Sequence, residues 1–140
     1  MDLALWNVLH DGRVIAVEGA IPGDLRLSVQ IPYLCGHLPT RATYVTIALS
    51  GCKLFEYMPY EYPLVAEPDA IATRGLELLS AWLAADGCVR VECADGGAGG
   101  QLYLRYTSAQ AITAEGRLIS QMELESAAER YWSQWQQERA

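Results

Sequence analysis

The chain has two histidines, His10 and His37, and they are the first residues to consider for catalysis. His10 stands next to Asp11, so this pair could supply a general base and the carboxylate that orients it. Adjacent residues in a turn rarely aim at one substrate atom, however, and Asp11-Gly12 is a dipeptide that suits a tight turn. We therefore interpret the pair as part of a turn and assign no catalytic residue.

Cysteine and histidine also raise the question of a metal site. Cys35 and His37 could both hold a zinc ion, with His10 or Cys52 completing the site. The sequence has no second pair at metal-ligand spacing, so it predicts no metal site. Lys53 could activate the thiol of Cys52, but strand alternation puts that thiol on a packed face. We expect all four cysteines to be reduced and buried as small hydrophobic residues: Cys35, Cys52, Cys88 and Cys93.

Carboxylates and glycines do not point to a reaction either. Several acidic residues lie near one another, in the loop region of Glu56, Glu61, Glu67 and Asp69 and on the C-terminal segment with Glu123 and Glu125, where solvated surfaces account for them. The glycine-rich stretch Ala94–Gly100 is followed by neither a helix nor a Lys-Ser or Lys-Thr pair, as a phosphate-binding loop requires. The sequence therefore predicts that the protein is not an enzyme and uses no cofactor.

The strongest binding candidate is an aromatic segment that runs from Phe55 to Pro63 and mixes tyrosines with acids and prolines. Tyrosine and methionine are enriched at the centres of protein interfaces, and prolines lower the entropy lost when a loop is fixed on binding. Alternatively, the tyrosines fold back over the sheet and leave their hydroxyls in water. We predict that a protein partner or a second copy of the chain binds Tyr57, Met58, Tyr60 and Tyr62.

Composition limits the class of protein. A length of 140 residues fits one domain, expected to span residues 1–140, and 51% of the residues are hydrophobic. The net charge of −7 and the scattered basic residues argue against nucleic acid and favour a basic partner, although acidity often serves solubility alone. The chain has no long apolar run and no signal-peptide pattern, so we expect no membrane contact and a cytoplasmic location. Lys53 is the only lysine, which suggests a GC-rich bacterial genome.

The first part of the chain reads as three strands joined by tight turns. The strands are expected at Leu3–Leu9, Val14–Val17 and Leu25–Ile31, with turns at His10–Gly12 and Pro22–Asp24. Apolar and polar residues alternate along the whole third strand, as they do when one face of a sheet is buried. Short turns join antiparallel neighbours, and a sheet with one apolar face needs a covering layer.

Further strands are predicted at Ala42–Ser50, Lys53–Met58 and Gln101–Thr107, where apolar or aromatic residues alternate with others. Between them, Tyr33–Pro39 is a compact connection and Pro59–Pro68 is a loop that its prolines keep out of the sheet.

The segment Ile71–Ala85 fits two structures. Its apolar residues match a helical stripe, which Gly75 weakens. Alternatively, Leu76–Leu83 pairs with Cys88–Cys93 across Asp86-Gly87, a dipeptide that favours a hairpin turn. We favour the hairpin.

The C-terminal segment predicts a helix. Ser120 and Glu123 have the spacing of a capping box, in which each side chain binds a free amide of the first turn. Apolar residues then recur at helical spacing: Leu124, Ala127, Ala128, Tyr131, Trp132 and Trp135. We expect this helix to lie on the sheet. The sequence therefore predicts an α+β fold with a mostly antiparallel sheet of about seven or eight strands, covered by a C-terminal amphipathic helix.

Two segments carry a resemblance to known proteins: Leu9-His10-Asp11-Gly12-Arg13-Val14-Ile15 and, later, Leu49-Ser50-Gly51-Cys52. Together they resemble small, uncharacterised bacterial proteins with an N-terminal His-Asp-Gly turn between strands. Some of those proteins are grouped with immunity proteins of toxin loci, which neutralise a toxin by binding it. The resemblance covers the first part of the chain and implies a small acidic binding domain without catalytic residues.

Two hypotheses about function follow. The first is a non-enzymatic interaction protein, in the manner of an immunity protein, that binds a basic partner or itself. The second is a small-molecule-binding protein or an enzyme with a pocket between sheet and helix, in which His10, Cys35 and His37 supply the polar groups.

Overall fold

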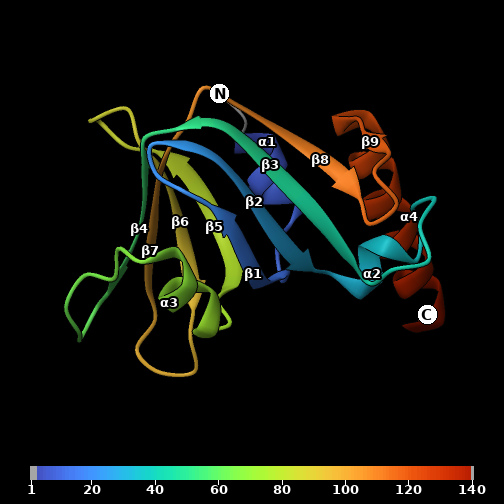
Figure 1. Cartoon of the computed structure of the whole chain (residues 1–140). Helices are drawn as coiled ribbons and strands as arrows, with labels where there is room; N and C mark the ends of the chain where they lie inside the picture. Colours follow the sequence, from blue (N-terminus) through green and yellow to red (C-terminus); the bar gives the residue numbers. More distant parts are fainter. Residues whose placement is uncertain (1–2, 140) are drawn as a thin grey trace.

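The computed structural model describes residues 3–139 and confirms the α+β fold, with a nine-stranded antiparallel sheet and a C-terminal helix that packs on it (Figure 1). The strands are β1 (Arg13–Gly19), β2 (Gly23–Gln30), β3 (Tyr44–Cys52), β4 (Leu54–Pro59), β5 (Glu77–Leu83), β6 (Val89–Ala94), β7 (Gly100–Arg105), β8 (Ser108–Thr113) and β9 (Leu118–Ile119). The helices are α1 (Leu3–Val8), α2 (Pro32–Cys35), α3 (Pro68–Thr73) and α4 (Gln121–Arg139). The strand order is β4-β7-β6-β5-β1-β2-β3-β8-β9.

A shared bend makes this sheet curl back on itself. Only Lys53 separates β3 from β4, and β8 follows β7 almost directly. Because β3 pairs with β8 and β4 pairs with β7, the segments β3–β4 and β7–β8 form one long two-stranded antiparallel ribbon. At the bend, Gly51 has a φ of 62°, and the Thr107 amide donates to the Ser50 carbonyl at 2.9 Å. Because β3 and β4 lie far apart in the strand order, the bent ribbon connects two distant parts of the sheet.

The enclosed face of the curled sheet carries the core. Alternate residues along the strands point inward, as the predicted period of two requires, and they are at most 1% exposed. These residues are Val14, Leu25, Leu27, Val29, Val45, Ile47, Leu49, Phe55, Tyr57, Leu78, Val89, Val91, Cys93, Leu102 and Leu104. The strands predicted in β1, β2, β3, β4 and β7 are therefore confirmed, with boundaries shifted by one to a few residues.

The prediction of a strand at Leu3–Leu9 is wrong, because this segment forms α1. The buried residues Leu5, Trp6 and Leu9 lie on one side of a helix, although Leu5 and Leu9 also fit an alternating strand. Two long-range contacts hold the helix in place. The indole of Trp6 donates to the Tyr106 hydroxyl at 2.9 Å, and the side chain of Asn7 accepts the amide of Ala81 in β5 at 2.9 Å.

The hairpin prediction for the second half of the ambiguous segment is confirmed, because β5 pairs with β6 in antiparallel register. The turn uses the predicted dipeptide: Gly87 has a φ of 84°, and Asp86 accepts the Cys88 amide at 3.0 Å. The preceding residues form the short helix α3, which begins at Pro68 and buries Ile71. The sequence did not predict α3, β8 or β9, which are short and have weak apolar patterns.

Helix α4 begins as predicted but covers less of the sheet than expected. The backbone amide of Glu123 donates a hydrogen bond to the Ser120 hydroxyl, and the backbone amide of Ser120 donates one to the Glu123 carboxylate, both at 3.1 Å. Leu124 and Ala127 are the buried residues of this helix. The expectation that the whole apolar stripe lies on the sheet is wrong for its second half, because Trp132 and Trp135 are exposed. Among residues 3–139, no helix has the length and apolar character needed to span a membrane.

The capping box gives the first testable prediction. Replacing Ser120→Ala removes the acceptor of the Glu123 amide and should lower the free energy of unfolding by about 1 kcal/mol. Urea denaturation measures this change. Ser133→Ala, on an exposed part of the same helix, is the matched control and should change stability by less than about 0.5 kcal/mol. Equal effects of the two substitutions would contradict a stabilising role for the cap.

Candidate interaction surface

A series of aromatic rings joins α2 to the second half of α4. Tyr33 in α2 lies 4.6 Å from Tyr131 between ring centroids, Tyr131 lies 5.0 Å from Trp132, and Trp132 lies 5.9 Å from Trp135. The guanidinium of Arg139 stacks over the Trp135 ring, 4.3 Å from its centroid. We call these four rings the aromatic ladder: Tyr33, Tyr131, Trp132 and Trp135.

Local structure fixes the first ring of the ladder. Pro32 begins α2, whose residues Leu34 and Cys35 are buried, so that Tyr33 is left on the outer side of this short helix. The Tyr33 hydroxyl donates to the His10 carbonyl. Arg130 of α4 donates to the His37 carbonyl at 2.7 Å, which ties the end of α2 to α4.

The last two rings of the ladder are open to solvent. The exposed fraction is 40% for Trp132 and 36% for Trp135, and every residue from 132 to 139 is exposed. Among the described residues, no protein acceptor binds the indole N–H of Trp132 or Trp135, whereas that of Trp6 has one. The end of α4 therefore combines large apolar surface with free hydrogen-bond donors, which is the chemistry of a contact surface.

Both histidines of the chain flank this surface. His37 lies 6.3 Å from the Tyr131 ring, and His10, next to Tyr33, forms a half-exposed pair with Asp11 at 3.3 Å. Burial, followed by the nearby charge of Asp11, raises the pKa of Tyr33 to about 12, so the phenol stays neutral and keeps its proton for the bond to His10. Tyr33, His37 and Tyr131 thus pack together as rings between α2 and α4.

The residues considered for a zinc site do not form a group of metal ligands in the part of the chain that the structure describes. Cys35 is buried, and burial raises the pKa of its thiol to about 11, which leaves it protonated and unreactive at neutral pH. Burial raises the pKa of Cys93 to about 12 and also raises that of Cys52. Among residues 3–139, no group of three or more His, Cys, Asp or Glu side chains is placed to hold a metal ion.

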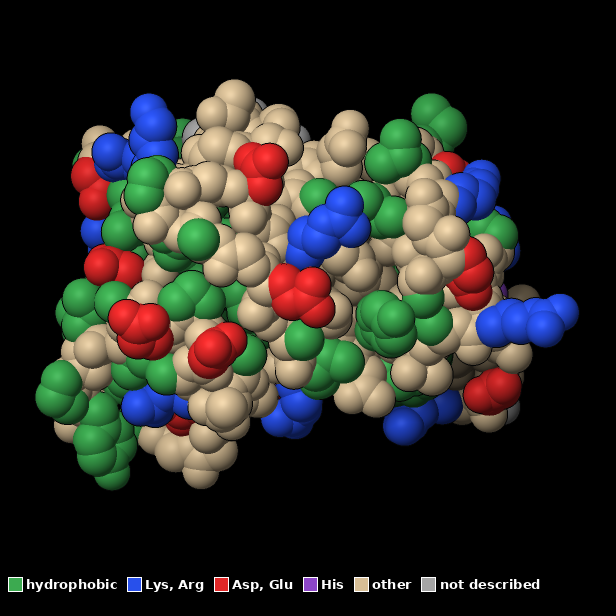
Figure 2. All heavy atoms as spheres, in the orientation of Figure 1, with side chains coloured by type: hydrophobic (Ala, Val, Ile, Leu, Met, Phe, Trp, Pro, Cys, Tyr) green, Lys and Arg blue, Asp and Glu red, His purple; other side chains and the backbone are tan. Residues whose placement is uncertain are grey.

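The four residues predicted to bind a partner lie in different surroundings. Tyr57 is fully buried in the core, and its hydroxyl donates to Asp95 at 2.7 Å, while Met58 is half-buried. Tyr60 and Tyr62 are 51% and 65% exposed and, with the exposed Leu64, belong to the loop between β4 and α3. Figure 1 shows this loop projecting from the sheet, and Figure 2 shows hydrophobic side chains at the same side of the molecule. Strand alternation places Tyr57 on the inner face beside Phe55, so this part of the segment cannot contact a partner.

Tyr60 is exposed, yet its hydroxyl is already satisfied. It donates to the Glu92 carboxylate at 2.8 Å and accepts a bond from the Gln101 amide at 3.0 Å. The bond to Glu92 is the main cause that raises the pKa of Tyr60. Tyr60 is therefore anchored to the outer face of β6 and β7, and Tyr62 is the freer tyrosine of this loop.

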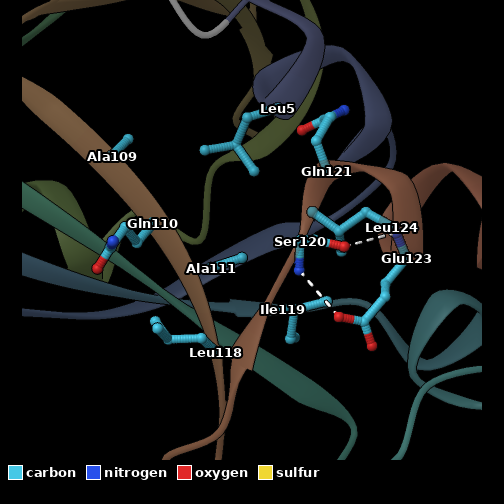
Figure 3. A pocket seen from close by; sticks show the side chains of 10 residues that line it. All are labelled: Leu5, Ala109, Gln110, Ala111, Leu118, Ile119, Ser120, Gln121, Glu123 and Leu124. Atoms are coloured by element: carbon cyan, nitrogen blue, oxygen red, sulfur yellow. Dashed lines mark hydrogen bonds between the residues drawn. The ribbon is translucent and has the colours of Figure 1, made fainter.

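A pocket of about 380 Å³ lies between the sheet edge and α4, in the place where the second hypothesis expects one (Figure 3). It is lined by residues of β8 and β9, by Leu5 of α1, and by the start of α4 including Leu124. The lining does not include His10, Cys35 or His37. His37 lines a separate hollow of about 330 Å³ with Met122 and Arg130.

Comparison of the chain with protein-family models, curated proteins and solved structures finds no match. The resemblance of the His10-Asp11-Gly12 segment to immunity-type proteins therefore stays a prediction. In the structure this turn follows a helix rather than a strand, and Asp11 has a φ of 70°.

The partly buried bond between Tyr57 and Asp95 gives a pH-dependent prediction. Bonds from the Tyr57 hydroxyl and the Gly97 amide lower the pKa of Asp95, so the stability they contribute is present above the pKa of the unfolded carboxyl and is lost as pH falls through the folded value. Tyr57→Phe should lower the free energy of unfolding at neutral pH by about 1–3 kcal/mol. At acid pH the difference from the wild type should narrow.

Urea denaturation at a series of pH values measures this difference. Tyr103→Phe removes a hydroxyl from the outer, half-buried face of β7 and should leave stability nearly unchanged at every pH. A Tyr57→Phe effect that stays constant from neutral to acid pH would show that the charge of Asp95 does not strengthen the bond.

Proposed function

We propose that this protein is a non-enzymatic interaction domain that binds a protein partner through the aromatic ladder. The observation that carries the proposal is the exposure of Trp132 and Trp135, at 40% and 36%, in a contiguous series of rings at the end of α4. Soluble monomers rarely expose such apolar clusters without a binding role.

The residue types and their rigidity support this proposal. Tryptophan, tyrosine and arginine dominate the binding energy of protein interfaces, and the ladder consists of these residues, with Arg139 at its end. Each ring already packs against the next, so a partner would immobilise few additional rotamers.

The acidic balance of the chain bears on the kind of partner. The net charge is −7, and the Lys and Arg side chains on the face shown in Figure 2 are scattered without a basic patch. A basic protein, such as the toxin that an immunity protein neutralises, would be attracted by this charge. The four cysteines are free and buried, which suits the reducing bacterial cytoplasm that we propose as the location.

A double substitution in the ladder tests the proposed function. Trp132→Ala with Trp135→Ala should weaken partner binding or self-association at least roughly tenfold, because interface tryptophans often contribute more than about 1.4 kcal/mol. The two indoles are partly exposed and lie outside the core, so the free energy of unfolding should fall by no more than about 2 kcal/mol. Quantitative mass spectrometry of proteins retained from bacterial lysate, together with sedimentation velocity, measures the change.

The projecting loop provides the matched control. Tyr60→Ala with Tyr62→Ala removes two exposed rings from another part of the surface and should leave association unchanged if the ladder is the contact. Loss of binding in this loop variant, with the tryptophan variant unaffected, would contradict the proposal and support the sequence-based prediction instead.

The pocket beside α4 favours a second candidate function, the binding of a small apolar molecule. Its volume of about 380 Å³ lies within the usual range of small-molecule sites. Its lining combines apolar side chains such as Leu118 and Ile119 with a few polar ones, including Gln110.

An uncharged solvatochromic dye, Nile red, tests this second function. The dye should bind saturably, and Ala109→Leu, which adds bulk to the pocket lining, should weaken its binding at least about tenfold. The Trp132→Ala/Trp135→Ala variant is the control and should bind the dye as the wild type does. Dye binding that is insensitive to Ala109→Leu would place the dye elsewhere and remove this candidate.

A further inference from the structure

The residues along one stripe of α4 have the spacing that is typical of a helix packed against a second helix. Its residues follow one another in alternating steps of four and three: Gln121, Glu125, Ala128, Trp132, Trp135 and Arg139. This is the heptad spacing with which two helices pack along a common seam. Ala128 packs partly against the core, while Glu125, Trp132, Trp135 and Arg139 are exposed.

The place of α4 in the fold leaves this stripe accessible at its C-terminal end. Figure 1 shows the end of α4 beside α2, at one side of the molecule and away from most of the sheet. In the ladder, Tyr33 of α2 packs against Tyr131 and against the Trp132 ring at 6.1 Å between centroids. The next ring, Trp135, packs on Trp132 and Arg139.

The stripe carries one acidic and one basic residue, Glu125 and Arg139, placed so that two antiparallel copies of the stripe would pair them. Glu125 precedes Trp132 by the same distance in sequence as Arg139 follows it. A two-fold axis near Trp132 would therefore bring Glu125 of one helix to Arg139 of the other, twice, and would set the two helix dipoles antiparallel. The two Trp132 side chains would meet at the centre.

Resting on the proposed function, we infer that the partner at the aromatic ladder is a second copy of this chain, with the two α4 helices packed antiparallel about a two-fold axis near Trp132. A two-fold contact requires a surface that complements itself, and the order acidic, apolar, basic along this stripe meets that requirement. A general basic partner fits the stripe less well, because the exposed, positively charged Arg139 stands at its C-terminal end.

The expected dimer is weak. The exposed half of one helix is small beside the area of about 1,600 Å² that a stable interface buries, and the net charge of −7 on each copy opposes association. We expect a dissociation constant on the order of 1–100 μM, which corresponds to about −8 to −5 kcal/mol. Sedimentation equilibrium over about 1 μM to 1 mM covers this range.

Charge reversal tests the register directly. Glu125→Arg and Arg139→Glu should each weaken the dimer several-fold when studied alone, because each places two pairs of like charges in contact. An equimolar mixture of the two variants restores both opposite-charge pairs and should form a heterodimer at least as tight as the wild-type dimer. Glu138→Arg is the control off the stripe, and Trp132→Ala should weaken the dimer at least roughly tenfold.

The outcomes separate this inference from the proposed function. Rescue in the mixture, together with loss in Trp132→Ala, supports the antiparallel dimer. A wild-type chain that stays monomeric at about 1 mM, yet retains other proteins through Trp132 and Trp135, overturns the dimer and leaves the interaction function standing. A dimer that ignores both the charge reversals and Trp132→Ala overturns the inferred contact, and a chain that neither dimerises nor retains a protein overturns both.

Discussion

The bend shared by the β3–β4 and β7–β8 segments is the constraint on which the fold depends. A Cβ atom added to Gly51 would lie 2.5 Å from the Thr107 hydroxyl, and the positive φ of 62° at Gly51 is unfavourable for other residues. Glycine therefore allows both segments to turn at one place while Lys53 and Arg105 continue the hydrogen bonding at 2.8 Å. As a result, the β3–β8 pair and the β4–β7 pair, which are joined at this bend, belong to two distant parts of the sheet. The apolar faces of these two parts enclose a common core.

This enclosure explains why α4 has apolar residues that the sheet does not bury. A flat sheet with one apolar face would need a long helix to cover it. The curled sheet buries most of that face against itself, so α4 contributes only Leu124 and Ala127 to the buried set. The other helices supply the remaining cover, α1 through Trp6, α2 through Leu34 and α3 through Ile71. Tyr131 and Trp132, in the second half of α4, pack on Tyr33 of α2 instead of on the sheet, and Trp135 packs on Trp132.

The sequence predicted the features that depend on local pattern. The alternation of β2, the Asp86-Gly87 hairpin and the Ser120–Glu123 cap each follow from spacing within a few residues, and all three are confirmed. Features decided by distant contacts were missed. The pattern of Leu5 and Leu9 fits either a strand or a helix, and the contacts that hold the helix come from far along the chain, from Tyr106 to Trp6 and from Ala81 of β5 to Asn7. Tyr57 is an exception, since continuing the Phe55 alternation would have placed it in the core.

The difference between local pattern and distant contacts also explains why the sequence favours the loop around Tyr60 and Tyr62 as the binding site, whereas the structure favours the aromatic ladder. Composition draws attention to the segment from Phe55 to Pro63, but one of its tyrosines is a core residue and Tyr60 already bonds to Glu92 and Gln101. The rings of α4 were assigned to the sheet because a stripe of apolar residues normally faces a core. Once the curled sheet buries its own face, the indoles of Trp132 and Trp135 have neither a core to enter nor an acceptor among the described residues. A partner that supplied both would stabilise this end of the helix, and the proposed interaction function therefore rests on how the sheet closes.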